Sequence, residues 1–114
     1  MRWSKRFYVT KRLLAVVGIA LVIITPGYAS SDVAIRVKDN RCLACHQVDK
    51  KRVGPSFIAI AERYSTLESP EQVLFNSMMH GSRGRWGAVP MPAQTHVSVE
   101  DAKSIVEWIL SLVE

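Results

Sequence analysis

Apolar residues recur at helical spacing near the carboxyl end of the chain, and this stripe is its clearest structural signal. The stripe consists of Ala102, Ile105, Val106, Ile109, Leu112 and Val113. Apolar positions repeating at i, i+3, i+4 and i+7 predict an amphipathic helix with one buried face. The run Ser98-Val99-Glu100-Asp101 opens this helix, and we expect its stripe to pack against the first helix of the domain.

Three further helices are predicted before it. The first covers residues 32–40, and the second covers residues 57–64, with Ser56 as its N-cap. The third begins at Ser69-Pro70-Glu71-Gln72, which combines a capping serine, a proline at the first helical position and a glutamine at the third. It runs to about His80. No clear strand is visible, so the predicted fold class is all-α.

The first 29 residues read as an export signal. Five basic residues precede residues 13–24, a run of twelve without a charge, and Pro26 then breaks the run. Small residues at Gly27 and Ala29 suit a signal peptidase, so we predict a secretory signal peptide over residues 1–29 and one domain over residues 30–114. An uncleaved anchor is the alternative, but the run is shorter than the about 20 residues that span a bilayer. The predicted domain is therefore exported, with no membrane span left after cleavage.

Cleavage changes the meaning of the chain's charge. The whole chain has a formal net charge of +5, whereas residues 30–114 hold ten basic and ten acidic residues. That domain lacks a basic face with interleaved aromatic residues, which argues against nucleic-acid binding.

The stretch Cys42-Leu43-Ala44-Cys45-His46 carries the chemistry. Two cysteines three residues apart, followed directly by a histidine, are the attachment signature of a c-type haem. Each thiol would form a thioether with one vinyl group, and His46 would bind the iron as an axial ligand. A dithiol redox motif lacks its βαβ context here, a zinc site lacks a second ligand pair, and a disulfide across two residues would stabilise little.

The loop over residues 81–97 is long for so small a domain, and such loops usually serve a function. We expect it to be structureless and to present Met91 to the iron, because Pro90 and Pro92 stiffen the chain on both sides. A thioether sulfur opposite an imidazole is a stable ligand pair for haem iron. The competing ligands are Met78, Met79, His80 and His96.

These motifs together resemble the small class I bacterial cytochromes c, of the cytochrome c-551 type, over residues 32–114. The resemblance includes Val53-Gly54-Pro55, the run Gly84-Arg85-Trp86-Gly87-Ala88-Val89-Pro90-Met91-Pro92, and a final helix with Trp108. It implies one covalently attached haem c with His46 and Met91 as axial ligands. It also implies that the Pro55 carbonyl accepts a hydrogen bond from the ligand imidazole, and that Trp86 lies by a haem propionate. After Pro92 this chain is one residue longer than the family pattern, and Gln94 is a candidate for the asparagine that steadies the methionine.

With both axial positions filled and no catalytic group visible, the predicted function is a periplasmic monohaem one-electron carrier, not an enzyme. The alternatives are a haem subunit of a larger respiratory enzyme and a haem sensor with a labile sixth ligand. Expected partners are a periplasmic reductase, a terminal oxidase or a quinol-oxidising complex, met by a monomer. Because the domain is formally neutral, we expect weak steering and an apolar docking rim at residues 48–53 and 89–93.

Overall fold

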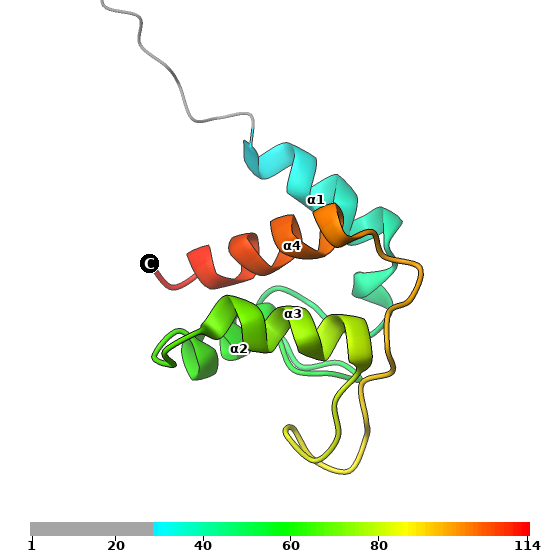
Figure 1. Cartoon of the computed structure of the whole chain (residues 1–114), viewed down its shortest axis with the longest axis vertical. Coiled ribbons are helices and arrows are strands. Elements are labelled where there is room, and N and C mark those ends of the chain that lie inside the picture. Colours follow the sequence, from blue (N-terminus) through cyan, green and yellow to red (C-terminus); the bar gives the residue numbers. More distant parts are fainter. Residues whose placement is uncertain (1–28) are drawn as a thin grey trace, which may run out of the picture.

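The computed structural model describes residues 29–114, which form four α-helices and one short 3₁₀ helix (Figure 1). The helices are α1 (Ala29–Asp39), η1 (Cys42–Ala44), α2 (Phe57–Tyr64), α3 (Pro70–His80) and α4 (Val99–Ser111). The all-α prediction is confirmed: within residues 29–114 the sole β-type pairing is an isolated bridge between Ser82 and Met91. The predicted leader lies outside the described residues except for Ala29, which is the first residue of α1.

Helices α2 and α4 begin at the predicted serines, and both serines cap the helix with their hydroxyls. The Ser56 hydroxyl accepts a hydrogen bond from the Ala59 amide at 3.1 Å, and Ser98 caps α4 in the same way. Ser69 also occupies the N-cap position, of α3, but the prediction that its side chain caps the helix is wrong. Its backbone, at φ −139° and ψ 66°, departs from the extended conformation seen at Ser56, and Gln72 bonds to Asn76 instead.

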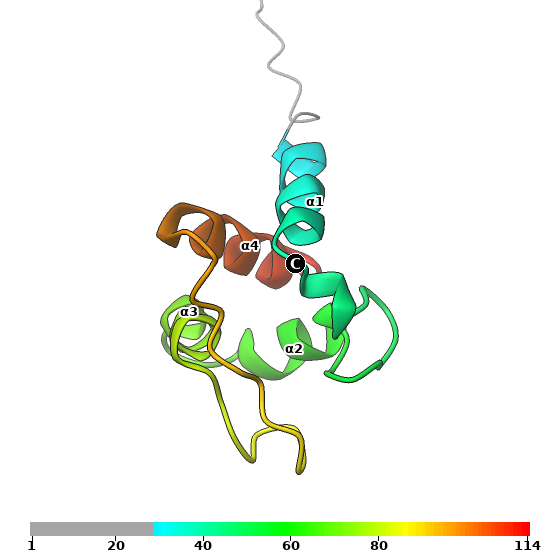
Figure 2. The same ribbon diagram turned by 90° about the vertical axis from the view of Figure 1, so that its right-hand side faces the viewer.

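Helix α4 packs against α1, α2 and α3, and the other helices are arranged around it (Figures 1 and 2). The predicted stripe is buried from Ala102 to Ile109, and Leu110 is buried beside it. The stripe was extended too far, however, because α4 ends at Ser111. Leu112 is only partly buried and Val113 is exposed.

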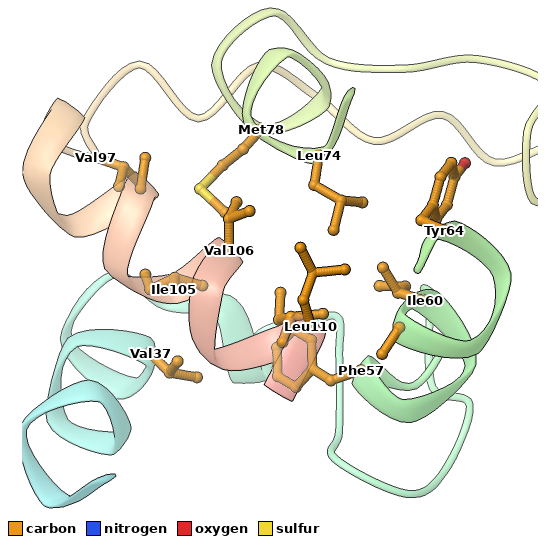
Figure 3. Packing of buried hydrophobic residues seen from close by; sticks show 13 residues of the cluster. Val37, Phe57, Ile60, Tyr64, Leu74, Met78, Val97, Ile105, Val106 and Leu110 are labelled. Atoms are coloured by element: carbon orange, nitrogen blue, oxygen red, sulfur yellow. The ribbon is translucent and has the colours of Figure 1, made fainter. Parts of the chain in front are cut away.

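The side chains that surround α4 form one apolar core. Figure 3 shows Val37 of α1, Phe57, Ile60 and Tyr64 of α2, and Leu74 and Met78 of α3 converging on Ile105, Val106 and Leu110 of α4. Several of these residues, among them Ile60, Leu74 and Ile105, also line a cavity that opens beside α2. The core therefore serves as the inner wall of that cavity.

A polar cluster fastens the end of α1 to the start of α4. The Arg36 guanidinium pairs with the Asp101 carboxylate, and the Asn40 amide donates to Asp101 Oδ2 at 2.9 Å. These hydrogen bonds, from Asn40 first and Arg36 second, lower the pKa of Asp101 below its ordinary value. The cluster lies where the chain leaves α1 and enters η1.

No helix within residues 29–114 has the length and apolar character needed to cross a lipid bilayer.

Candidate haem site

The two cysteines lie on a single tight turn at the edge of the cavity. The Cys45 and His46 amides both donate to the Cys42 carbonyl, at 3.2 and 3.0 Å, which closes the turn over η1. Both cysteines are free thiols, and both line the cavity. Burial raises the pKa of the Cys42 thiol, whereas Cys45 is exposed. The turn therefore offers two neighbouring thiols to one edge of the cavity.

The imidazole ring of His46 is held directly by its neighbours. Its side chain is buried, and its Nδ1 lies 2.7 Å from the Pro55 carbonyl oxygen. A carbonyl only accepts hydrogen bonds, so Nδ1 carries the proton and Nε2 is left with its lone pair. The ring stacks on Phe57 with centroids 5.2 Å apart and planes at 23°. The imidazole is thus oriented for Nε2 to bind a metal.

The loop behind His46 leaves no spare room. A Cβ atom added to Gly54 would lie 2.6 Å from His46 Cε1, so any side chain there would displace the ring. The Gly54 amide donates to the Cys45 carbonyl at 2.8 Å, and the Phe57 amide donates to the Gln47 carbonyl at 2.9 Å. Sequence reasoning quoted Gly54 without giving it a role, and it missed the stacking of Phe57. No local signal marks either contact, because each depends on the closed loop.

Met91 is positioned through its backbone. Its amide and carbonyl exchange hydrogen bonds with Ser82, both at 3.0 Å. The prediction that the loop over residues 81–97 is structureless is therefore wrong. A Cβ atom added to Gly81 would lie 2.7 Å from the Met91 carbonyl oxygen, and Gly81 has a φ of +78°. A glycine at the end of α3 therefore lets the returning segment of the loop, which contains Met91, pass close to the end of that helix.

The loop is also anchored to two helices near its tip. The Arg63 guanidinium of α2 lies 4.5 Å from the Trp86 ring centroid, and its Nη1 donates to the Arg85 carbonyl. The Arg85 side chain in turn donates to Ser77 Oγ of α3 at 3.2 Å. These contacts hold Trp86 half-buried beside Tyr64, at a centroid distance of 6.2 Å.

The competing ligands lie in less suitable surroundings. Met78 borders the cavity but is buried, and Figure 3 shows its sulfur directed toward Val106. His96 Nε2 lies 3.1 Å from the Asn40 carbonyl oxygen, outside the cavity wall. Met79 and His80 are likewise absent from that wall. Gln94 borders the cavity, and its side-chain amide donates to the Pro92 carbonyl at 2.8 Å.

All six predicted site residues line the same cavity, namely Cys42, Cys45, His46, Pro55, Trp86 and Met91. The imidazole and the thioether come from different segments, and apolar side chains form the inner wall between them. Within residues 29–114 no group of three or more His, Cys, Asp or Glu side chains could hold a bare metal ion. Two thiols, one nitrogen donor, one soft sulfur and an apolar wall are the groups that a covalently attached haem needs.

Comparison with known proteins agrees with a haem site in this cavity. The sequence model of the cytochrome c family matches residues 35–113, so the chain belongs to that family. Cytochrome c-552 of Nitrosomonas europaea is 41% identical over 93 residues, which are 82% of this chain and 89% of that protein. Cytochrome c-551 of Pseudomonas denitrificans is 45% identical over 75 residues, which are 66% of this chain and 90% of that protein.

The fold agrees as well. The crystal structure of wild-type Nitrosomonas europaea cytochrome c552 matches with a TM-score of 0.67 and 43% identity, covering 69% of this chain and 98% of that one. A class 1 cytochrome from Sideroxydans lithotrophicus ES-1 matches with a TM-score of 0.61 and 27% identity, covering 75% of this chain and 97% of that one. The chain is a small class I cytochrome c that carries one covalently attached haem c. It is an electron carrier and not an enzyme, and it works with redox partners.

Proposed function

We propose that His46 Nε2 and Met91 Sδ are the two axial ligands of the haem iron in this electron carrier. The observation that carries the proposal is that both side chains line one cavity while the Pro55 carbonyl occupies His46 Nδ1. A bound haem c supplies a single reversible electron at its iron. With two protein ligands on the iron, the protein's part is to hold both ligands still and to keep water away.

The remaining site residues support that task. Cys42 and Cys45 would anchor the haem through thioethers, which their shared turn favours. Pro55 would fix the imidazole plane and raise the basicity of Nε2 by accepting the Nδ1 proton's hydrogen bond. Trp86 would lie by a haem propionate, at the part of the loop that Arg63 anchors.

We further propose that residues 1–29 are a signal peptide and residues 30–114 the cytochrome domain, working as a monomer in the periplasm. The basic start and the short apolar run of the leader support export. Suitable partners are a periplasmic reductase, a terminal oxidase or a quinol-oxidising complex. Deleting residues 1–29 should abolish covalent haem incorporation in cells, and holoprotein formed in the cytoplasm without the leader would contradict this.

The ligand assignment is tested by the weak long-wavelength absorption band of an iron–thioether bond in the oxidised protein. Met91→Ala should abolish this band and lower the reduction potential, because the soft sulfur favours reduced iron. The matched controls are Met79→Ala and Met78→Ala, which remove a methionine outside the proposed ligand pair. Both should keep the band, although Met78→Ala should cost stability because that residue is buried. Survival of the band in Met91→Ala would refute the assignment.

A further inference from the structure

The end of the loop over residues 81–97 is tied to the chain just ahead of the cysteine turn. His96 Nε2 lies 3.1 Å from the Asn40 carbonyl oxygen, although 56 positions separate the two residues. A carbonyl only accepts hydrogen bonds, so Nε2 carries a proton and donates it. Among the hydrogen bonds of the described residues, this is the one that joins the loop to the segment over residues 40–57, which contains the cysteine turn.

Asn40 is the point where three segments meet. Its side-chain amide donates to the Arg36 carbonyl of α1 and to Asp101 Oδ2 of α4, both at 2.9 Å. Its carbonyl, which receives His96, also lies 3.9 Å from Cys42 Sγ. Formation of a thioether removes the thiol hydrogen, so His96 remains as the donor to that carbonyl in the holoprotein. The acceptor of the His96 bond thus belongs to a residue that two helices already hold.

The backbone after Asn40 shows how firmly this point is fixed. Arg41 is left-handed, at φ 59° and ψ 20°, and it is the sole non-glycine residue among the described ones with a positive φ. This conformation is destabilising for a residue with a Cβ atom, and it persists only where the surrounding contacts enforce it. The contacts of Asn40 supply that enforcement directly before the cysteine turn.

The donor of the bond is also fixed at its own end. The Gln94 amide donates to the Met78 carbonyl at 2.8 Å, and the Val97 amide donates to the Gln94 carbonyl at 3.1 Å. Val97 is buried, so the turn that carries His96 is anchored on both sides. Four residues lie between His96 and Met91, and the first of them is a proline. A movement of this turn is therefore transmitted to the methionine over a short, stiff stretch.

The other contacts of the loop hold it to a different part of the molecule. The bridge to Ser82 lies next to the end of α3, the Arg63 and Arg85 side chains join the loop to α2 and α3, and the Gln94 amide also reaches α3. The His96 bond alone reaches across to the side of the cysteine turn. Its loss would leave the loop free to move away from that turn while its contacts with α2 and α3 persist.

We propose that His96 is a positioning residue, which clasps the loop of Met91 to the cysteine turn through the Asn40 carbonyl and thereby limits dissociation of the Met91 sulfur from the iron. The inference rests on the proposed function, because it takes Met91 as an axial ligand. His96 is exposed and lies outside the cavity wall, so it acts through the loop and does not touch the cavity itself.

The proposal is tested by titrating the oxidised holoprotein with imidazole, which can bind the iron only when Met91 has left it. The apparent affinity therefore reports the fraction of molecules in which the methionine has dissociated. His96→Ala should raise that affinity about 2- to 10-fold, the effect of losing one net hydrogen bond. The matched control is His80→Ala, which also removes an exposed histidine and should leave the affinity unchanged. An unchanged affinity in His96→Ala, or an equal rise in both variants, would overturn the proposal.

His96→Gln separates the hydrogen bond from the size and aromatic character of the side chain. A glutamine amide nitrogen reaches about as far as histidine Nε2 and can donate to the same carbonyl, so this variant should bind imidazole about as weakly as the wild type. A rise equal to that in His96→Ala would overturn the role of the hydrogen bond.

Guanidinium unfolding of the same variants distinguishes positioning from a general loss of stability. In His96→Ala the iron–thioether band should disappear at a lower guanidinium concentration, while the midpoint of helix unfolding, followed by far-ultraviolet circular dichroism, shifts less. Equal shifts of the two transitions would overturn the positioning role. Survival of the band in Met91→Ala would instead refute the ligand assignment, so the two failures are distinguishable.

Discussion

In one part of the cavity wall the ring of His46 is fixed directly, by a 2.7 Å contact with the Pro55 carbonyl and by stacking on Phe57. In another part the backbone of Met91 is fixed by its bridge to Ser82, and no hydrogen bond restrains its sulfur among the described contacts. We call these two regions the histidine wall and the methionine wall. The contacts of the histidine wall lie within residues 42–57, whereas the methionine wall also uses Arg63 of α2 and Ser77 of α3.

The difference indicates how each wall should respond to damage. The histidine wall consists of short loops closed by local hydrogen bonds, so it should keep its geometry as long as the ring itself is present. The methionine wall depends on several contacts between separate segments, so we expect the sulfur to become more mobile when one of them is lost. We therefore expect the bond between iron and the Met91 sulfur to be weaker than the bond between iron and His46, and to be lost first during unfolding.

The largest effect should come from His46→Ala. Truncating a buried Phe or Trp to Ala costs about 3–5 kcal/mol, and this variant removes a similarly buried ring together with a proposed iron ligand. A loss of this size is comparable with the whole stability of a small domain. Guanidinium unfolding of the holoprotein measures it. The control is His80→Ala, an exposed position, which should change the stability by less than about 0.5 kcal/mol. Equal stability of the two variants would contradict the inference that the His46 ring stabilises the histidine wall.

A smaller loss of stability is expected from Gly81→Ala, which alters only the methionine wall. Its positive φ and its 2.7 Å approach to the Met91 carbonyl should together cost about 2–4 kcal/mol and weaken the iron–thioether band. Gly84→Ala is the matched control, because its φ is +69° but nothing lies within 4 Å of the added Cβ. It should cost about 1 kcal/mol and leave the band intact. If both variants keep the band, the backbone bridge does not position the sulfur.

A still smaller effect is expected from Arg63→Lys, which keeps the charge and removes the planar group over Trp86. The loss of stacking should cost about 0.5–1 kcal/mol. The iron–thioether band should then disappear at a lower guanidinium concentration, while the midpoint of global unfolding shifts less. Glu62→Gln, an exposed neighbour in α2, should alter neither midpoint. If the band resists guanidinium as well as it does in the wild type, the contact between Arg63 and Trp86 does not help to position the Met91 sulfur.

The smallest effect should come from Asp101→Asn, which lies outside both walls and tests whether they are independent of the α1–α4 contact. The pKa of Asp101 is lowered in the folded protein by Asn40 and Arg36, so its carboxylate stabilises the fold above the ordinary aspartate pKa of about 3.9. That contribution is lost as the pH falls through the lowered folded value. The variant should be less stable at pH 7 and should converge with the wild type in strong acid. A change in the iron–thioether band at pH 7 would mean that the walls are coupled to this contact.

Much of the architecture was predictable from local signals. The bounds of α2 and α3 and the start of α4 agree with the sequence, because serine caps, Pro70 and apolar spacing act within a few residues of one another. The end of α4 was misjudged at Leu112 because an apolar stripe does not show where a helix stops. Ser69 was predicted correctly as the N-cap residue of α3, but its side-chain capping bond was misjudged, because a residue type does not specify its own backbone angles.

The sequence by itself determined the chemistry of this protein, since two thiols, a histidine and a methionine between two prolines are local patterns whose spacing carries their meaning. Tertiary structure alone decided how these groups are held and what surrounds them. The bridge between Ser82 and Met91 and the guanidinium of Arg63 over Trp86 both join residues that are not neighbours along the chain. Periodicity and motif spacing describe neighbours along the chain, whereas contacts and fields depend on which neighbours folding brings together in space.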